Sequence, residues 1–245
     1  MAPKGTSSVF WQSVYAGVMA AGRDLDVDIL WNGPPQETEF ARQIQIVDSM
    51  INRRVDGIVL SPAERTALVG VVERAAKVGI PVTIFDSGLD SAKYVTFVAT
   101  DNLGAGKLAA KTLWEMLGRP GPIALMKHVP GSASTGNREI GFHEAVAETY
   151  TGIEIVAEQF CMSDRARALA VAEDFLTSHP ELKAIFCSSE AGTVGVARAL
   201  ESRNMVDKVK LLGFDGSPVL QEGLASGAID ALIVQDPYKI GYIGV

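Results

Sequence analysis

Short apolar runs that end in small, acidic or amide residues recur along the chain. They are IVLSP at 58, IFDSG at 84, FVATDN at 97, ALMKH at 124, IFCSSE at 185, LLGFDGS at 211 and LIVQDP at 232. Runs of this kind predict buried strands of a parallel sheet. Because the carboxyl ends of parallel strands meet at one edge, and ligands bind outside that edge, we expect Asp86, Asp101, Asp215 and Gln235 to converge there.

Amphipathic helical patterns alternate with the first strands of this series. Helices are predicted at 10–24, 36–53 and 66–78, and strands at 27–31, 57–60 and 81–85. Within the helix at 36–53, the apolar side chains expected to cover the sheet are Phe40, Ile44, Val47 and Ile51. Because strand, helix and strand follow one another with crossovers of this length, a parallel sheet with helices on both faces is predicted.

The same alternation begins again after Asn102. A helix at 103–117 is followed by strands near 123, 154, 184 and 210 and by helices near 138, 166, 192 and 218. With 245 residues, 47% of them apolar, the chain can bury two medium-sized cores. The sequence therefore predicts an α/β fold of two doubly wound parallel-sheet lobes, an N-terminal lobe of residues 1–102 plus 236–245 and a C-terminal lobe of residues 103–235. The chain crossings between them form a hinge, and hinges of this kind close a cleft around a ligand.

The charge pattern and the cysteines argue against several classes of protein. The net charge is -7, and acidic and basic residues are interleaved, so a nucleic-acid-binding face is not expected. No apolar run reaches the roughly 18 to 20 residues of a membrane-spanning helix. Cys161 and Cys187 lie outside any CxxC or Cys/His pattern, which predicts no metal site. A strand near 123–127 is expected to separate them, too far apart for a disulfide.

No arrangement of residues in the sequence indicates catalysis. His128, His143 and His179 are scattered, and none has a Cys, Ser or Asp placed to form an activated nucleophile. The segment GSASTG lacks the GxSxG spacing of a nucleophile elbow and the GK[ST] ending of a P-loop, and no GxGxxG follows a first strand. We therefore expect no enzyme and no cofactor. An α/β enzyme acting on a sugar would need a perturbed acid or base, for which the sequence offers no candidate.

Seven segments, in this order, carry a resemblance that covers nearly the whole chain: VDGIVLSP, GIPVTIFDSG, VATDN, SASTGNREIGF, HPELKAIFC, VKLLGFDGSP and IVQDPYKIGYIG. The chain resembles the sugar-binding type I periplasmic binding proteins, whose fold is shared with the effector domains of LacI-type repressors. The resemblance implies a receptor in the periplasm, or otherwise outside the cytoplasm, that binds a neutral sugar or polyol and delivers it to the membrane permease of an ABC importer. The effector-binding domain of a LacI-type transcription regulator is the alternative.

The resemblance also implies a set of ligand-binding residues. The positions that match those of ribose-binding members are Phe10, Trp11, Asp86, Arg138, Asp215 and Gln235. Aromatic faces cover the apolar side of a pyranose, while carboxylate, guanidinium and amide groups bond to its hydroxyls. Acids and amides outnumber bases in this set, with Arg138 alone to offset the carboxylates, so an uncharged ligand is expected.

Three further positions differ from those of ribose binders. Ser8, Ser163 and Ser189 stand where those proteins carry Asn, Phe and Asn. Smaller side chains there, with Trp11 beside Phe10, suggest a pocket for a larger or differently substituted sugar than ribose.

Each of these roles has a plainer structural alternative. Phe10 and Trp11 are also consistent with the buried edge of a helix, and Arg138, placed at a helix start, with an exposed surface arginine. The two strand-end aspartates are consistent with turn residues that accept backbone N–H bonds. Asp101 and Asn102 are expected to be hinge and helix-cap residues rather than ligand contacts.

The two ends of the chain differ from the family pattern. The chain begins at MAPKGTSSVFW, where members of the family carry an apolar strand, and it stops at GYIGV, before their final elements. We therefore expect the first strand of the N-terminal lobe and the C-terminal elements to be missing. A basic-then-apolar signal segment is absent from this chain as well.

Overall fold

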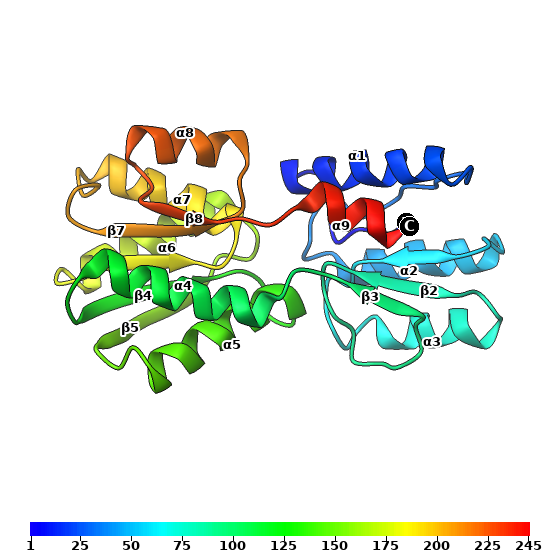
Figure 1. The fold of residues 1–245 in the computed structure, drawn as a ribbon, viewed down its shortest axis with the longest axis horizontal. Helices are drawn as coiled ribbons and strands as arrows, with labels where there is room; N and C mark the ends of the chain where they lie inside the picture. Colours follow the sequence, from blue (N-terminus) through cyan, green and yellow to red (C-terminus); the bar gives the residue numbers. More distant parts are fainter. The chain divides into compact units, whose positions relative to one another are not determined.

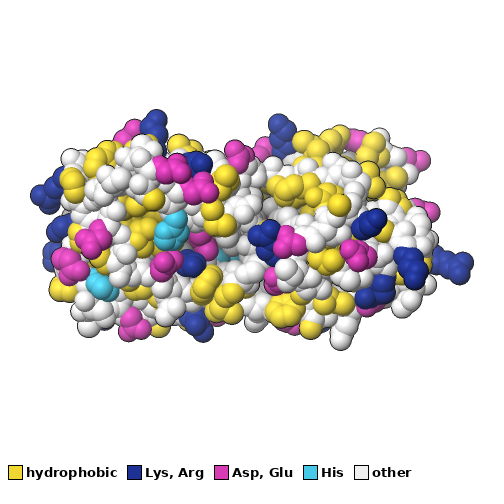
Figure 2. Space-filling model, turned by 90° about the horizontal axis from the view of Figure 1, so that it is seen from below, with side chains coloured by type: hydrophobic (Ala, Val, Ile, Leu, Met, Phe, Trp, Pro, Cys, Tyr) yellow, Lys and Arg dark blue, Asp and Glu magenta, His cyan; other side chains and the backbone are white.

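The computed structural model of the protein describes residues 1–245 and divides them into two compact units (Figure 1). Unit 1 comprises Met1–Thr100, Gly131–Ser134 and Asp236–Val245, and unit 2 comprises Asp101–Pro130 and Thr135–Gln235. None of the helices combines the length and apolar character needed to cross a membrane. On the face shown in Figure 2, acidic and basic side chains are interspersed among hydrophobic ones.

Unit 1 is built on a three-stranded parallel sheet with the strand order β1-β2-β3. Its strands are β1 (Ile58–Leu60), β2 (Val82–Phe85) and β3 (Thr96–Val98), and its helices are α1 (Val9–Asp24), α2 (Phe40–Asn52), α3 (Val69–Lys77) and α9 (Pro237–Gly244). Side chains of α2 and α3 pack against one face of the sheet, and those of α1 and α9 pack against the other. Each face therefore has its own apolar core.

Unit 2 is built on a five-stranded parallel sheet with the order β5-β4-β6-β7-β8. Its strands are β4 (Gly121–Lys127), β5 (Ile153–Phe160), β6 (Ala184–Cys187), β7 (Lys210–Phe214) and β8 (Ala231–Ile233). Its helices are α4 (Asn102–Leu117), α5 (Ala133–Glu148), α6 (Arg165–Ser178), α7 (Glu190–Ser202) and α8 (Pro218–Ser226). Helices α4 and α5 cover one face, and α6, α7 and α8 cover the other. The predicted doubly wound α/β fold is confirmed.

The strand predicted at 27–31 does not form. This segment is irregular, and it lies beside Met1, whose amino group donates to the Leu30 carbonyl at 2.5 Å while Asn32 N–H donates to the Met1 carbonyl at 3.1 Å. A strand requires a ladder of several such pairs, which this contact does not supply. Near the N-terminus, Ala2 forms an isolated parallel bridge with Leu60 of β1, and β1 is the first strand of the structure.

The buried side of α2 differs from the predicted apolar stripe. Phe40 is 43% exposed, whereas Gln43 is fully buried beside Val47 and Met50. The Gln43 amide donates to the carbonyls of Ala2, Pro3 and Ser61, and its oxygen accepts from the Ala63 N–H. Buried backbone N–H and carbonyl groups that form no sheet or helix hydrogen bond need such side-chain partners. Gln43 supplies them here, so α2 faces the core with Gln43 and leaves Phe40 at the surface.

Two helix pairs approach closely through glycine. In the α4–α5 pair, a Cβ at Gly106 would lie 2.0 Å from the Arg138 carbonyl oxygen, and a Cβ at Gly141 would lie 2.1 Å from that of Leu103. The same spacing recurs in the α1–α9 pair, in which the residues are Gly17, Tyr238, Gly241 and Val14. These glycines let the helix backbones touch, so they fix the position of α5, which carries Arg138.

Candidate functional site

A buried carboxylate follows the second strand of unit 1. Asp86 comes directly after Phe85 in the left-handed conformation, with φ 59°, and its N–H donates to the Val98 carbonyl of β3 at 2.8 Å. Its Oδ2 accepts a hydrogen bond from Ser61 Oγ at 2.9 Å and lies 3.2 Å from Lys4 Nζ. Its side chain therefore bonds to side chains rather than serving as a simple turn residue.

Lys4 is a residue that the sequence analysis missed. It is 2% exposed, and besides Asp86 its ammonium group donates to Ser132 Oγ at 3.1 Å and Ser134 Oγ at 2.8 Å. With one acceptor for each of its three N–H donors, the buried ammonium group has the partners that a buried charge requires. Its sequence signal is slight, a lone lysine between Pro3 and Gly5. Lys4 holds the segment Gly131–Ser134 beside Asp86.

The predicted aromatic pair lies at the start of α1. Ser8 caps this helix, and its Oγ accepts from the Trp11 N–H at 3.5 Å. Trp11 is buried, and its ring packs edge-on against that of Phe85, with 6.1 Å between the ring centres. Its Nε1 donates to Glu37 Oε1 at 2.9 Å. Phe10 is half-buried and contacts Trp11 edge-on at 5.0 Å. Trp11 thus forms part of the core beneath this end of the sheet, and Phe10 lies nearer the surface.

Arg138 is the most tightly held of the predicted residues in unit 2. It is 3% exposed, which rules out a surface arginine. Its Nε donates to Asn102 Oδ1 at 2.8 Å and its Nη1 to the Ser188 carbonyl at 2.9 Å, while its guanidinium carbon lies 3.7 Å from the centre of the Phe214 ring. A guanidinium over an aromatic face is attracted to it. The expected place at a helix start is corrected, because α5 begins at Ala133.

The segment where α4 begins serves two purposes. Asp101 caps the helix, as expected, and its Oδ1 accepts from the Gly104 N–H at 2.9 Å. Asn102, expected to be a cap or hinge residue, is instead the first residue of α4 and accepts the bond from Arg138. The amide therefore positions the guanidinium.

Asp215 and Gln235 lie together at the ends of neighbouring strands. Asp215 follows Phe214 of β7 with φ 76°, and its N–H donates to the Ile233 carbonyl at 2.9 Å. Its Oδ1 accepts from Gln235 Nε2 at 2.7 Å. Because Arg138 stacks on Phe214, the structure brings Arg138, Asp215 and Gln235 to the same edge of the sheet.

The predicted serines of unit 2 are placed differently from one another. Ser163 follows Met162 after β5, both with left-handed backbone, at the edge of the sheet opposite to β8 and hence remote from Gln235. Ser189 lies at the start of α7, is buried, and its Oγ has no hydrogen-bond partner. Ser189 directly follows Ser188, a partner of Arg138. Ser189 therefore lies beside the polar group at β7 and β8, whereas Ser163 does not.

A buried carboxyl next to Arg138 was not predicted. Glu139 Oε1 accepts from the His128 N–H at 3.2 Å and from Ser188 Oγ at 2.9 Å. Burial raises the pKa of Glu139, although these two hydrogen bonds act in the opposite direction. The sequence signal was the Arg-Glu pair, which gave no sign that both side chains turn inward.

The two cysteines are free and buried. The sheet order places β4 between β5, which precedes Cys161, and β6, which ends at Cys187, so the predicted separation is confirmed. Burial raises the pKa of the Cys187 thiol well above its ordinary value, which suits packing rather than reactivity. No group of His, Cys, Asp and Glu side chains that could hold a metal ion is found.

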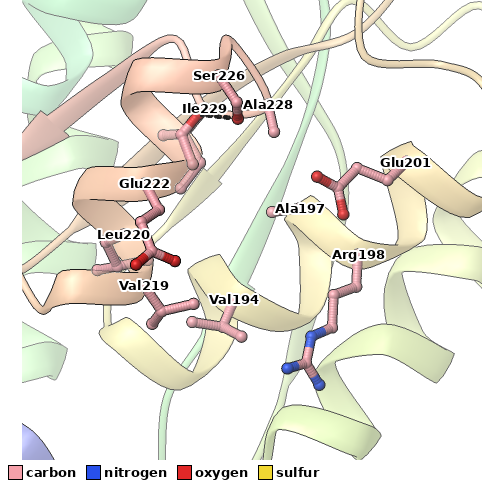
Figure 3. A pocket seen from close by; sticks show the side chains of 11 residues that line it. Val194, Ala197, Arg198, Glu201, Val219, Leu220, Glu222, Ser226, Ala228 and Ile229 are labelled. Carbon is pink, nitrogen blue, oxygen red and sulfur yellow. Dashed lines mark hydrogen bonds between the residues drawn. The ribbon is translucent and has the colours of Figure 1, made fainter.

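A surface pocket of about 260 Å³ lies between α7 and α8 of unit 2 (Figure 3). Apolar side chains, among them Val194, Leu220 and Ile229, form much of its lining, with Arg198 and Glu222 also contributing. None of the predicted site residues lines it. This surface pocket is therefore separate from the polar groups at the strand ends.

Comparisons with known proteins identify the family of this chain. Residues 1–245 match the family described as the periplasmic binding protein domain. The chain is 31% identical to the D-allose-binding periplasmic protein of Escherichia coli over 250 aligned residues, which cover 99% of this chain and 80% of that protein. It is 29% identical over 205 residues to a ribose import binding protein of Bacillus subtilis, spanning 84% of this chain and 66% of that protein.

A solved structure gives the same result for the fold. An ABC transporter solute-binding protein from Agrobacterium vitis, with bound D-fucose, superposes with a TM-score of 0.96 at 37% identity, covering all of this chain and 85% of that one. With the family match over the whole chain and a shared parallel-sheet architecture, the assignment is clear. The chain belongs to the periplasmic binding protein domain family, as a type I sugar-binding member.

Proposed function

We propose that this protein is the solute receptor of an ABC-type importer and binds a neutral sugar or polyol. The observation that carries the proposal is the grouping of Arg138, Asp215 and Gln235 around Phe214 at one sheet edge. Guanidinium, carboxylate and amide groups beside an aromatic ring are suited to an uncharged ligand rich in hydroxyls. The relatives described above bear names or bound ligands of the same class, D-allose, ribose and D-fucose.

Residues of both units contribute to the proposed site. Phe10, Trp11, Asp86 and Ser8 come from unit 1, and Arg138, Asp215, Gln235, Ser163 and Ser189 come from unit 2. We place residues 1–102 with 236–245 in one lobe and residues 103–235 in the other, joined by a hinge that closes over the ligand. The chain passes between the units near Asp101 and near Gln235, which supports these two boundaries, whereas Gly131–Ser134, inside the proposed second lobe, belongs to unit 1.

The charge balance supports a neutral ligand. Lys4 adds a cation that the sequence analysis did not count, but Asp86 already pairs with it. The Asp215 carboxylate is bonded to a neutral amide. A phosphorylated sugar would bring further negative charge beside the carboxylates of Asp86 and Asp215, and we expect phosphate to weaken binding.

A binding screen tests the proposal. Isothermal titration of the purified protein against D-ribose, D-allose, D-arabinose, D-fucose, polyols and sugar phosphates is expected to give binding of a neutral member, with Asp215→Ala reducing its affinity at least tenfold. Preference for a phosphorylated sugar would contradict the proposed ligand class. Absence of binding across the panel, with a cooperative thermal transition, would contradict the sugar receptor.

The transport receptor is favoured over the effector domain of a LacI-type regulator because the relatives named above are import or solute-binding proteins. In the proposed role the protein acts outside the cytoplasm, passes its ligand to a membrane permease and catalyses no reaction. Co-purification with a permease of the importer, dependent on the bound sugar, tests the partner.

A further inference from the structure

Two buried hydroxyl groups of unit 2 have no hydrogen-bond partner in the protein. They belong to Thr135, on α5, and Ser189, at the start of α7. Each residue is 5% exposed. Buried polar groups are nearly always paired, and leaving one unpaired is unfavourable. Two such hydroxyls therefore point to a role outside the internal bonding of the fold.

Neither hydroxyl forms the backbone hydrogen bond that is usual for its position in or before a helix. A serine before a helix normally accepts from a free N–H of the first turn, but Ser189 makes no such bond, and its carbonyl accepts from Thr193 instead. A helical threonine can donate to the carbonyl four residues earlier, which here is that of Gly131. That carbonyl accepts from the Arg65 N–H.

Both residues are close in the chain to Arg138 or to its hydrogen-bond partner. Thr135 precedes Arg138 by three residues on α5, and residues with this spacing share one face of a helix. Ser189 follows Ser188, whose carbonyl accepts from Arg138 Nη1 at 2.9 Å. The guanidinium itself lies over the ring of Phe214, at the end of β7. The two hydroxyls thus belong to the surroundings of the residue that anchors the proposed site in unit 2.

We propose that Thr135 and Ser189 each form a hydrogen bond with a different hydroxyl group of the ligand and so help to select it by the positions of its hydroxyls. This inference rests on the proposed function and deepens it. Ser189 already matches a ligand position of the family, and Thr135 is the new contact. A hydroxyl both donates and accepts, which suits a sugar hydroxyl and offers no charge to an ionic ligand.

Two variants test the inference, Thr135→Val and Ser189→Ala. Because neither hydroxyl is bonded within the protein, the thermal midpoint of each variant without ligand is expected to equal or exceed that of the wild type. Affinity for the sugar that the wild type binds is expected to fall about 5- to 100-fold in each variant. A deoxy analogue lacking the contacted hydroxyl binds wild type weakly and is expected to show no further loss in the matching variant.

Thr193→Val is the matched control. Its hydroxyl is also buried in unit 2 but donates to the Ser189 carbonyl at 2.8 Å and accepts from the Phe214 N–H at 3.2 Å. This variant is expected to lower the thermal midpoint. A similar drop in Thr135→Val would show that the Thr135 hydroxyl serves the fold, and would overturn the inference.

The outcomes separate the inference from the function on which it rests. Binding by the wild type together with unchanged affinity in Thr135→Val overturns the inference and leaves the sugar receptor standing. Absence of binding by the wild type to every sugar of the panel overturns the proposed function, and the inference with it.

Discussion

At the scale of single residues, the strand-end carboxylate of Asp86 depends on a buried cation. Asp86 forms a buried ion pair with Lys4, whose remaining donors go to Ser132 and Ser134. Removing one member of a buried ion pair leaves an uncompensated charge in the interior. Asp86 should therefore contribute strongly to stability.

Asp86→Asn is expected to lower the free energy of unfolding by about 3 to 5 kcal/mol, because Lys4 loses its counter-charge while still buried. Urea unfolding measures this, and adding Lys4→Met to the variant should restore part of the loss. Asp48→Asn is the control, since its pair with Arg74 at 2.7 Å is exposed, and its effect should stay below about 1 kcal/mol. Equal effects of the two substitutions would refute the role assigned to Lys4.

Glu139 makes stability depend on pH. Its pKa is raised from the ordinary value of 4.5 by burial, so the folded state binds the proton more tightly than the unfolded state does. The stability that this provides is complete below pH 4.5 and is lost as the pH rises through the raised pKa. Glu139→Gln keeps an oxygen that can accept from His128 and Ser188 but cannot ionise.

We therefore expect wild type and Glu139→Gln to unfold at similar urea concentrations near pH 4, and the wild type to fall behind the variant as the pH approaches 7. Glu158→Gln is the comparison, because nearby Lys127 and His143 contribute to lowering the pKa of that carboxyl. For Glu158 the difference should have the opposite sign, with the wild type gaining on its variant as the pH rises. A constant gap for Glu139→Gln would contradict the assignment.

The sequence predicted the residues at strand ends but not their partners. Asp86, Asp215 and Gln235 follow apolar runs whose ends can be read directly from the letters. The contacts of Lys4 with Ser132 and Ser134 join residues 128 and 130 positions apart, and no local pattern encodes such a contact. The inward turn of Glu139 was missed for the same reason, since it depends on how α5 packs.

At the scale of elements, sequence periodicity predicted nearly every helix and strand, because each buries one face against a sheet. The failures share one location. The irregular segment at 27–31 bonds to Met1, and α2 bonds through Gln43 to the carbonyls of Ala2 and Pro3, so both adjoin the first three residues of the chain. A hydropathy pattern reports apolar side chains and not backbone groups that need a hydrogen-bond partner. The prediction therefore placed Phe40 in the core, whereas it is exposed.

The glycine contact between α4 and α5 positions Arg138. Gly106→Ala would place a methyl group 2.0 Å from the Arg138 carbonyl oxygen, so the helices must separate, at a cost of about 1 to 3 kcal/mol in unfolding free energy. Gly136→Ala, on α5 with nothing within 4 Å of its Cβ position, should instead stabilise by about 0.5 to 1 kcal/mol. Chemical unfolding of both variants checks this. Stabilisation by Gly106→Ala would contradict the close packing.

At the scale of the whole molecule, each unit has its own sheet and its own apolar cores. Either unit therefore has the means to hold its binding residues in place. Sugar binding that engages both units should protect backbone amides in both, at Asp86 and at Asp215, where the N–H groups bond to neighbouring strands.

Hydrogen exchange with and without the sugar measures this protection. We expect slower exchange at both positions, by about tenfold or more. Amides of the surface pocket between α7 and α8, such as that of Ile229, are the internal control and should not change. Protection confined to one unit would contradict a ligand held by both.

A left-handed aspartate after a buried phenylalanine occurs in both units. Asparagine accepts this backbone conformation as readily as aspartate does, so an acid-to-amide exchange needs no rebuilding of the chain. At Asp86 such an exchange would leave the buried lysine without its counter-charge. Changes at this position during evolution are therefore expected to occur together with changes at Lys4.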